Sequence, residues 1–154
     1  MNWVGIDPGQ KGGLAYIKDN GELLDAVLMP AIGGEVDAIG LYHLLSNWTT
    51  GSAGVKVAIE QVHSMPGQGV SSTFKFGKNF GIAIGVVAAM QLPLHRITPQ
   101  AWKKQFVLTG KDKDASRGKA SELWPTMSEA WRFKYLNGVS DAALIAECAR
   151  RMSL

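Results

Sequence analysis

The chain has 154 residues, of which 46% are hydrophobic and 19% are charged, and its formal net charge at pH 7 is +3. This length and composition predict one globular domain over residues 1–154 and exclude a disordered chain. A lone cysteine, Cys148, excludes an internal disulfide and a multi-cysteine zinc site, and we expect it to pack in a core. The apolar stretch from Ile82 to Met90 is too short to cross a bilayer, and no secretory leader is visible, so we expect a cytoplasmic protein without membrane contact.

The basic residues are concentrated in one part of the sequence. Nine basic and four acidic residues lie between Arg96 and Lys134, so this window carries +5 and the rest of the chain carries −2. A one-sided basic region predicts a polyanionic partner, and a solvated helix face is the alternative.

The first predicted strand ends in a carboxylate. Val4 and Ile6 indicate a short buried strand, Asp7 follows, and Pro8-Gly9 ends it. A charge in that position is costly unless it is compensated. A similar β-branched run at 55–60 closes on a second acid, Glu60, and two strands that deliver carboxylates at one end predict a metal site.

The remaining elements predict the topology. Strands over 12–18 and 22–29 flank an Asp19-Asn20-Gly21 hairpin turn. The later helices and strands are predicted from the spacing of their apolar residues. These are a helix over 35–48, a helix over 71–90, a strand over 94–97 and helices over 102–107, 114–123 and 139–152, with Thr98-Pro99 starting a helix. The order predicts an α/β, ribonuclease H-like fold with a mixed five-stranded sheet and helices on both faces. In that layout the first and fourth strands are neighbours, which places Asp7 beside Glu60.

Glycines recur every four residues along the predicted helix over 71–90. Gly77, Gly81 and Gly85 give one face of the helix no side chains. We interpret this face as a dimer surface, and packing against the chain's own sheet is the alternative.

Asp141, near the start of the last predicted helix, is the third candidate ligand. An acid in a first turn also fits the helix dipole, but Ala142 and Ala143 allow close approach to the two strand-end acids. Three converging carboxylates favour divalent cations, and two Mg²⁺ ions would activate a water and stabilise the leaving oxygen of a phosphodiester.

Three motifs resemble those of the RuvC family of Holliday-junction resolvases. They are Gly5-Ile6-Asp7-Pro8-Gly9, Ala58-Ile59-Glu60-Gln61-Val62 and the run from Ser140 to Ala146. The segment from Met65 to Gly77 is similar to phage-borne members. The resemblance implies a homodimer that cuts four-way DNA junctions by paired symmetric nicks, using Mg²⁺ or Mn²⁺. It also implies that Asp7, Glu60 and Asp141 are metal ligands.

One position departs from the family pattern. RuvC-like chains commonly carry a fourth acid or a histidine one turn before the last aspartate, where this chain has Asn137. We expect Asn137 to ligate weakly through its carbonyl oxygen, with three carboxylates as the main ligands. A weakened or engineered variant is the alternative.

The basic window and the loop after Glu60 predict the DNA contacts. Lys104, Lys113 and Arg117 match positions where the RuvC family keeps basic residues close to the cut site, and the resemblance implies that Lys104 stabilises charge on the scissile phosphate. The loop from Val62 to Val70 is expected to act as a wedge at the junction centre. The residues expected to contact DNA are Met65, Pro66, Gln68, Phe74, Lys75, Lys103, Lys104, Lys111, Lys113, Arg117 and Lys119. Ordinary surface lysine is the alternative for each basic residue. His63, three residues after Glu60, is a further candidate to face the site, and a position outside the site is the favoured interpretation.

Several other functions remain open. A broader nuclease for three-way, flap or fork DNA, an RNA-processing YqgF-like enzyme, and a junction-binding module with weakened catalysis all fit the motifs. An actin-like ATPase shares the Gly-Ile-Asp start but needs two such domains, so we expect no nucleotide cofactor.

Overall fold

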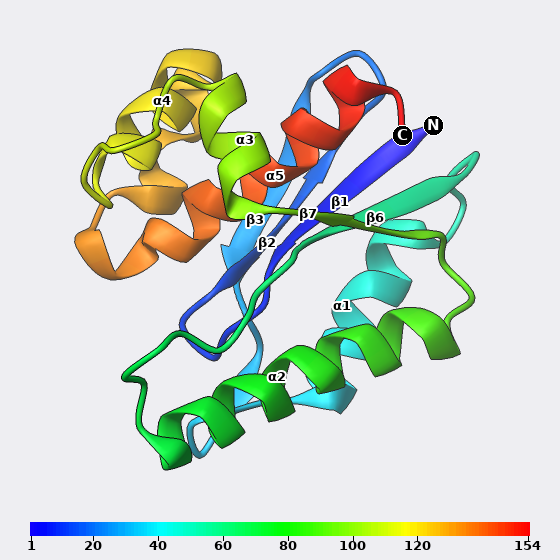
Figure 1. Ribbon diagram of the computed structural model, residues 1–154. Coiled ribbons are helices and arrows are strands. Elements are labelled where there is room, and N and C mark those ends of the chain that lie inside the picture. The colour runs from blue at the N-terminus through cyan, green and yellow to red at the C-terminus, as the bar shows by residue number, and fades with distance from the viewer.

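The structure, a computed structural model, describes residues 1–154 and is a mixed sheet between two layers of helices (Figure 1). The sheet consists of β1 (Asn2–Asp7), β2 (Gly13–Ile17), β3 (Leu23–Leu28), β6 (Val55–Glu60) and β7 (Leu94–Ile97). Their order is β3-β2-β1-β6-β7; β1, β2 and β3 are antiparallel neighbours, and β6 runs parallel to both β1 and β7. The predicted five-stranded mixed sheet is therefore confirmed, and β1 lies directly beside β6.

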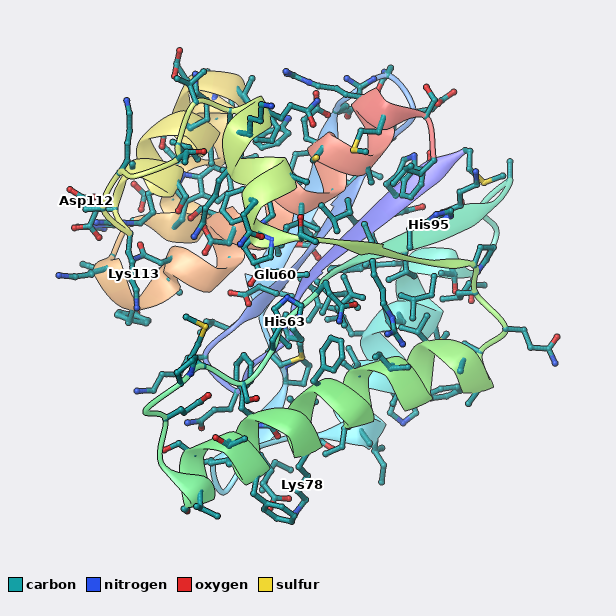
Figure 2. All side chains as sticks on the ribbon, in the orientation of Figure 1. Glu60, His63, Lys78, His95, Asp112 and Lys113 are labelled. Carbon is teal, nitrogen blue, oxygen red and sulfur yellow. The ribbon has the colours of Figure 1, made fainter.

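Helices cover both faces of the sheet. One face packs against α1 (Ala38–Thr49) and α2 (Val70–Ala89), and the other against α5 (Asn137–Met152), with α3 (Pro99–Gln105) and α4 (Ala115–Leu123) beside it. Side chains from each layer fill the space against the sheet (Figure 2), forming one apolar core on each face. Cys148 lies fully buried in the α5 core, as predicted. No helix is long and apolar enough to pass through a bilayer.

The predicted helix over 35–48 starts later than expected. Glu35–Val36 forms β5, which pairs with β4 (Ala31–Ile32) in a small separate hairpin. Gly33 and Gly34 make the turn with positive φ angles of 59° and 80°, which glycine adopts without strain. Asp37 then caps α1 by accepting a hydrogen bond from the amide of Ile39. The helix prediction was wrong for these first residues because the Gly-Gly turn competes with the helical pattern.

Helix α5 lies unusually close to the sheet. A Cβ added at Gly5 in β1 would overlap the carbonyl oxygen of Ala142, and one at Gly13 in β2 would overlap the backbone of Val139. The small side chains of Ala142 and Ala146 complete this close fit. The predicted close approach of α5 is therefore confirmed at Ala142, while Ala146 and the facing glycines of the sheet, which were not predicted, take part in it as well.

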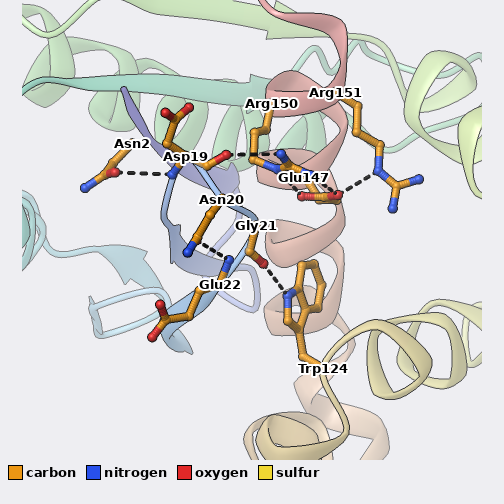
Figure 3. Close-up of polar contacts among 9 residues, drawn as sticks. All are labelled: Asn2, Asp19, Asn20, Gly21, Glu22, Trp124, Glu147, Arg150 and Arg151. Carbon is orange, nitrogen blue, oxygen red and sulfur yellow. Dashed lines mark hydrogen bonds and ion pairs between the residues drawn. The ribbon is translucent and has the colours of Figure 1, made fainter.

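The far end of α5 is attached to the β2–β3 hairpin (Figure 3). Glu147 is buried and forms ion pairs of 2.7 Å with Arg150 and 2.6 Å with Arg151. Burial alone would raise the pKa of Glu147, but hydrogen bonds from the two arginines outweigh it and lower the pKa. Arg150 also donates to the carbonyl of Asp19 at 3.1 Å, and Trp124 donates to the carbonyl of Gly21 at 2.9 Å. The Arg150 contact holds the C-terminal end of α5, the helix that carries Asp141, against the hairpin. The Trp124 contact, from the residue that follows α4, holds the α4 layer against the same hairpin.

The segment between α4 and α5 contains two short helices that the sequence pattern did not predict. They are the 3₁₀ helices η1 (Pro125–Trp131) and η2 (Lys134–Leu136). Trp131 is buried and donates a hydrogen bond of 2.9 Å to Ser121 of α4. This contact anchors η1 to the α4 layer and leaves the following residues at the surface.

Candidate active site

The parallel pairing of β1 with β6 brings two acids together. Ile6 is paired with Ile59 in the register, so Asp7 and Glu60 follow at the same end of neighbouring strands. Asp141 reaches the same place from the first turns of α5. All three carboxylates line one cavity of about 320 Å³, and Figure 2 shows Glu60 at the end of β6. The other residues of its wall are Trp102, Lys103, Leu108, Lys111, Asp112, Lys113, Ser116, Asn137 and Gly138.

A contact between two glycines positions α5 over the strand ends. Gly12, after β1, forms an isolated parallel bridge with Gly138 in the first turn of α5. A Cβ at Gly138 would lie 2.6 Å from the Cα of Gly12 and 2.6 Å from the carbonyl oxygen of Lys11. Only glycine fits there, and the close approach brings Asp141 near Asp7. The sequence pattern did not reveal this role, although the Asn-Gly pair before the helix was visible.

Asp7 is the most strongly perturbed acid of the cavity. Burial raises its pKa well above 3.8, and the charges of Asp141 and Glu60 raise it further, while Lys103 opposes them. A buried carboxylate among like charges favours either a proton or a bound cation. This electrostatic arrangement agrees with the prediction that Asp7 is a metal ligand.

Glu60 is oriented by an indole. The Nε1 of buried Trp102 donates a hydrogen bond of 2.6 Å to Oε2 of Glu60. Burial raises the pKa of Glu60, while this hydrogen bond and the charge of Lys103 lower it, and the net shift is upward. The role of Trp102 was not predicted from the sequence. The Thr98-Pro99 helix start, which places Trp102 on a helix, was the only feature of the sequence that pointed to it.

Asp141 has a pKa raised to about 6. Burial is the main cause and the charge of Glu60 adds to it, whereas the Ser116 hydroxyl, Lys103 and Lys113 oppose the shift. At neutral pH the cavity therefore holds carboxylates that gain from a neighbouring cation.

Asn137 lines the same cavity and carries a buried oxygen without a hydrogen-bond partner. Its Nδ2 donates to Oδ1 of Asp114 at 3.3 Å, whereas its own Oδ1 is buried and accepts no hydrogen bond. Asp114 remains a good acceptor, because hydrogen bonds from Asn137 and Arg117 lower its pKa. An orphaned buried acceptor is costly unless a donor or a cation occupies its lone pairs.

The oxygen donors of the cavity fit a hard divalent cation. They are carboxylate and amide oxygens, without a cysteine or histidine in the wall. No group of three or more acidic, histidine or cysteine side chains is placed to hold a metal ion. Mg²⁺ needs only one or two protein carboxylates, because water and phosphate oxygens complete its shell.

The cation beside the carboxylates is Lys103, one residue away from the predicted Lys104. Both lysines are exposed, but only Lys103 lines the cavity and lowers the pKa of all three acids. The one-residue difference is a 100° rotation around α3, which the sequence pattern did not resolve because both neighbours are lysines. Lys111 and Lys113 also line the cavity, and Figure 2 shows Lys113 beside Asp112 on the loop before α4.

Comparison with known proteins assigns the chain to a family. No protein-family model matches it. It is 32% identical over 114 residues to the crossover junction endodeoxyribonuclease RuvC of Nitratidesulfovibrio vulgaris, with 70% of this chain and 68% of that protein covered. The chain belongs to the RuvC family.

Three solved structures share the fold of this chain. Thermus thermophilus RuvC has a TM-score of 0.68 at 19% identity, covering 99% of this chain and 97% of its own. T. thermophilus RuvC in complex with Holliday junction substrate has a TM-score of 0.65 at 16% identity, covering 99% and 96%. The yeast mitochondrial Holliday junction resolvase Ydc2 gives 0.58 at 14% identity, covering 97% and 77%. The predicted ribonuclease H-like fold is confirmed.

Other predicted DNA contacts of this RuvC-family chain lie around a second, polar groove. Lys75 and Gln68 line it together with Lys11, and it shares Asp7 and Lys113 with the first cavity. It therefore continues the cavity toward α2 and supplies further positive charge for a nucleic-acid backbone.

The loop after Glu60 is exposed at its tip. Met65 is 68% exposed, Pro66 is exposed beside it, and Gln68 accepts a hydrogen bond from the Met65 amide at 3.2 Å. Phe74 is 73% exposed on α2. These positions leave the wedge prediction open to test, while His63 is exposed and lies outside the cavity wall.

Two predicted DNA contacts are already engaged within the protein. Arg117 is half-buried, pairs with Asp114 at 3.1 Å and donates to the carbonyl of Arg132 at 3.2 Å. Lys119 pairs with Glu122 at 2.8 Å. Neither side chain lines the cavity. Arg117 and Lys119 therefore pair with neighbouring acids on their own segment and do not lie beside the three carboxylates of the cavity.

Proposed function

We propose that this chain is a metal-dependent, structure-specific endodeoxyribonuclease that resolves four-way Holliday junctions by paired symmetric nicks. The observation that carries the proposal is the single cavity that Asp7, Glu60, Asp141, Asn137 and Lys103 line. Its RuvC-family membership supports it, since the bacterial relative is a crossover junction endodeoxyribonuclease. The T. thermophilus structure with a bound junction substrate supports it as well.

Each residue of the cavity has a separate task in this reaction. Asp7, Glu60 and Asp141 would hold Mg²⁺, or Mn²⁺ in its place, with Asn137 Oδ1 as a weaker ligand. Bound metal would supply an activated water and stabilise the departing oxygen. Lys103 approaches from α3 and would balance negative charge on the scissile phosphate. Trp102 keeps one oxygen of Glu60 occupied and so fixes which oxygen faces the ion.

We further propose a homodimer formed through α2. Cβ atoms added at Gly77, Gly81 or Gly85 would meet nothing within 4 Å, so these glycines face away from the chain's own sheet. The alternative of packing on that sheet is therefore wrong. A second copy of α2 could approach this face closely, and two sites per dimer suit the two-fold symmetry of a four-way junction.

The remaining parts of the proposal are the setting and the domain. We assign residues 1–154 to one nuclease domain that acts on branched DNA in the cytoplasm of a bacterial cell or a phage-infected host. The segment from Met65 to Gly77 supports the phage-borne origin, as its resemblance to phage members indicates.

The test is Mg²⁺-dependent nicking of strand-labelled DNA. Wild-type protein should cut a four-way junction symmetrically, with three-way, flap and linear duplex DNA cut more slowly, and Asp7→Asn should abolish cutting. Equal rates on all branched substrates would favour the broader nuclease. Tight, salt-sensitive junction binding without any cleavage would contradict the enzyme and favour a junction-binding module.

A further inference from the structure

Two aromatic rings are stacked on each other at the surface between η1 and α5. Phe133 is 49% exposed and Tyr135 is 67% exposed, and neither belongs to either core. Their ring centroids are 5.7 Å apart and the ring planes differ by 10°. We call residues 132–136 the aromatic strap; in Figure 1 it precedes the start of α5.

The exposure of these rings is not explained by the fold. Aromatic side chains contribute most to stability when they are buried, as Trp131 is only two residues before Phe133. Here two neighbouring rings are instead ordered by each other and leave much of their surface to solvent. A pre-stacked pair loses little side-chain freedom when a third flat group is added to it.

The aromatic strap itself carries two basic residues. The guanidinium of Arg132 lies 4.9 Å from the centre of the Phe133 ring, and Lys134 lies on the same segment. Two acids face this group: Glu129 is 3.5 Å from Arg132, with both side chains exposed, and Asp114 is already paired with Arg117. A surface ion pair such as Glu129–Arg132 is weak and yields readily to a phosphate.

The strap is attached to the active-site cavity through the backbone. Arg117 of α4 donates to the carbonyl of Arg132 at 3.2 Å, and the Leu136 amide donates to the carbonyl of Phe133 at 2.9 Å. The next residue, Asn137, lines the cavity and bonds to Asp114. A group bound on the strap would therefore sit at a fixed distance from the carboxylates.

We propose that the aromatic strap is a DNA-binding platform in which an unpaired base stacks on Tyr135 while Arg132 and Lys134 contact the flanking phosphates. The proposal rests on the proposed function for its ligand, DNA, and adds a contact surface separate from the cavity and from the loop after Glu60. Base–aromatic stacking tolerates any sequence, because every base has a flat face. A single-stranded stretch beside a branch, or a base pair that opens at the branch point, supplies such a base.

The test measures binding by fluorescence anisotropy with Ca²⁺ present, using an end-labelled four-way junction and a single strand of the same sequence. Tyr135→Ala should weaken single-strand binding about tenfold, and junction binding in the same direction. Tyr135→Phe should bind within twofold of wild type, because it keeps the ring. The matched control is Tyr42→Ala, which removes an exposed tyrosine of α1 that is 48% exposed and edge-on to His43.

The salt dependence separates stacking from phosphate contacts. Tyr135→Ala should leave the slope of log affinity against log salt unchanged, whereas Arg132→Gln should reduce it by about one. Quenching of a 2-aminopurine base in the single strand should be lost in Tyr135→Ala and kept in Tyr135→Phe.

Three results would bear on the proposal in different ways. Equal affinities of Tyr135→Ala and Tyr42→Ala for both DNAs would overturn it. A change in sedimentation of Tyr135→Ala at unchanged DNA affinity would also overturn it and assign the strap to contact with a second copy. Failure of wild type to nick any branched DNA would contradict the proposed function alone, and Tyr135-dependent single-strand binding would still support the platform.

Discussion

The indole Nε1 of Trp102 donates a 2.6 Å hydrogen bond to Oε2 of Glu60, and this contact connects the buried layer of α3 to the acidic end of β6. Hydrogen bonds to an ionised carboxylate are stronger than neutral ones and fix its rotamer. Glu60 therefore has one oxygen assigned to the protein and one available to the cavity.

Trp102→Phe should weaken Mg²⁺ binding about tenfold, because the ligand loses its outer hydrogen bond. The same change removes an interaction that lowers the pKa of Glu60, so the pH at which nicking rises should move upward. Calorimetric titration of Mg²⁺ and a pH–rate profile check both effects. Trp124→Phe is the matched control, because it also removes an indole donor, to the carbonyl of Gly21, away from the cavity. An unchanged pH profile in Trp102→Phe would show that the contact is structural only.

Lys103→Ala should slow junction nicking by about 100-fold, the typical effect of removing one preorganised donor from a developing charge. Lys104→Ala should slow it less than about threefold, because Lys104, unlike Lys103, lies outside the cavity wall. Single-turnover rates at saturating protein separate this effect from weaker DNA binding. The reverse order of the two variants would restore the assignment made from the sequence pattern.

The sheet and the acids could be predicted from local pattern, and the residues that orient the acids could not. Asp7 and Glu60 follow β-branched runs in the sequence, and the strand order then makes them neighbours. The indole of Trp102, in contrast, reaches Glu60 from a residue 42 positions away, and its rotation around a short helix decides the contact. For the same reason the sequence pattern placed Lys104 beside the scissile phosphate, whereas the structure places Lys103 in the cavity wall.

The close approach of α5 to the sheet was predicted from the residues of the helix and not from those of the sheet. Small residues of α5 were visible in the sequence, whereas Gly5 and Gly13 appeared as ordinary strand residues. Their importance depends on which helix crosses them, and this is a tertiary relationship. The aromatic strap was missed for a related reason, since exposure of Phe133 depends on where η1 anchors Trp131.

The metal-free protein should lose stability as the pH rises from about 4 to about 7. Asp141 titrates near 3.8 when unfolded and at about 6 when folded, so the folded state binds more protons between these values. Stability is then highest below the unfolded pKa and falls as the pH passes the folded one. For Asp141 alone, the difference between its folded and unfolded pKa corresponds to a loss of about 3 kcal/mol in the free energy of unfolding. Urea unfolding in EDTA measures it, with a smaller decline expected in Asp141→Asn and a recovery when Mg²⁺ is added at pH 7.5. Flat stability across this range would contradict the burial of the acid cluster.

Gly138→Ala should lower the free energy of unfolding by about 1–3 kcal/mol, because the new Cβ would overlap Gly12 and the Lys11 carbonyl. It should also move Asp141 away from Asp7 and so reduce Mg²⁺ affinity. Gly118→Ala is the matched control on α4, where an added Cβ meets nothing within 4 Å, and it should stabilise the helix by about 0.5–1 kcal/mol. Chemical unfolding of both variants gives the comparison, and equal stabilities would argue against the close glycine contact.

Asn137→Asp should raise Mg²⁺ affinity roughly tenfold while destabilising the metal-free protein. The added carboxylate gives the cavity a charged ligand where the orphaned amide oxygen now lies. Without metal, the same charge would replace the amide donor that bonds to Asp114 and would face that acid directly. The loss in unfolding free energy should be about 1 kcal/mol in EDTA.

Adding Asp114→Asn to Asn137→Asp should recover this loss, since the asparagine restores a hydrogen-bond donor, and Asp114→Asn alone serves as the control. Calorimetry with Mg²⁺ and unfolding in EDTA provide the two readouts. Unchanged Mg²⁺ affinity in Asn137→Asp would mean that the amide oxygen is not directed at the ion.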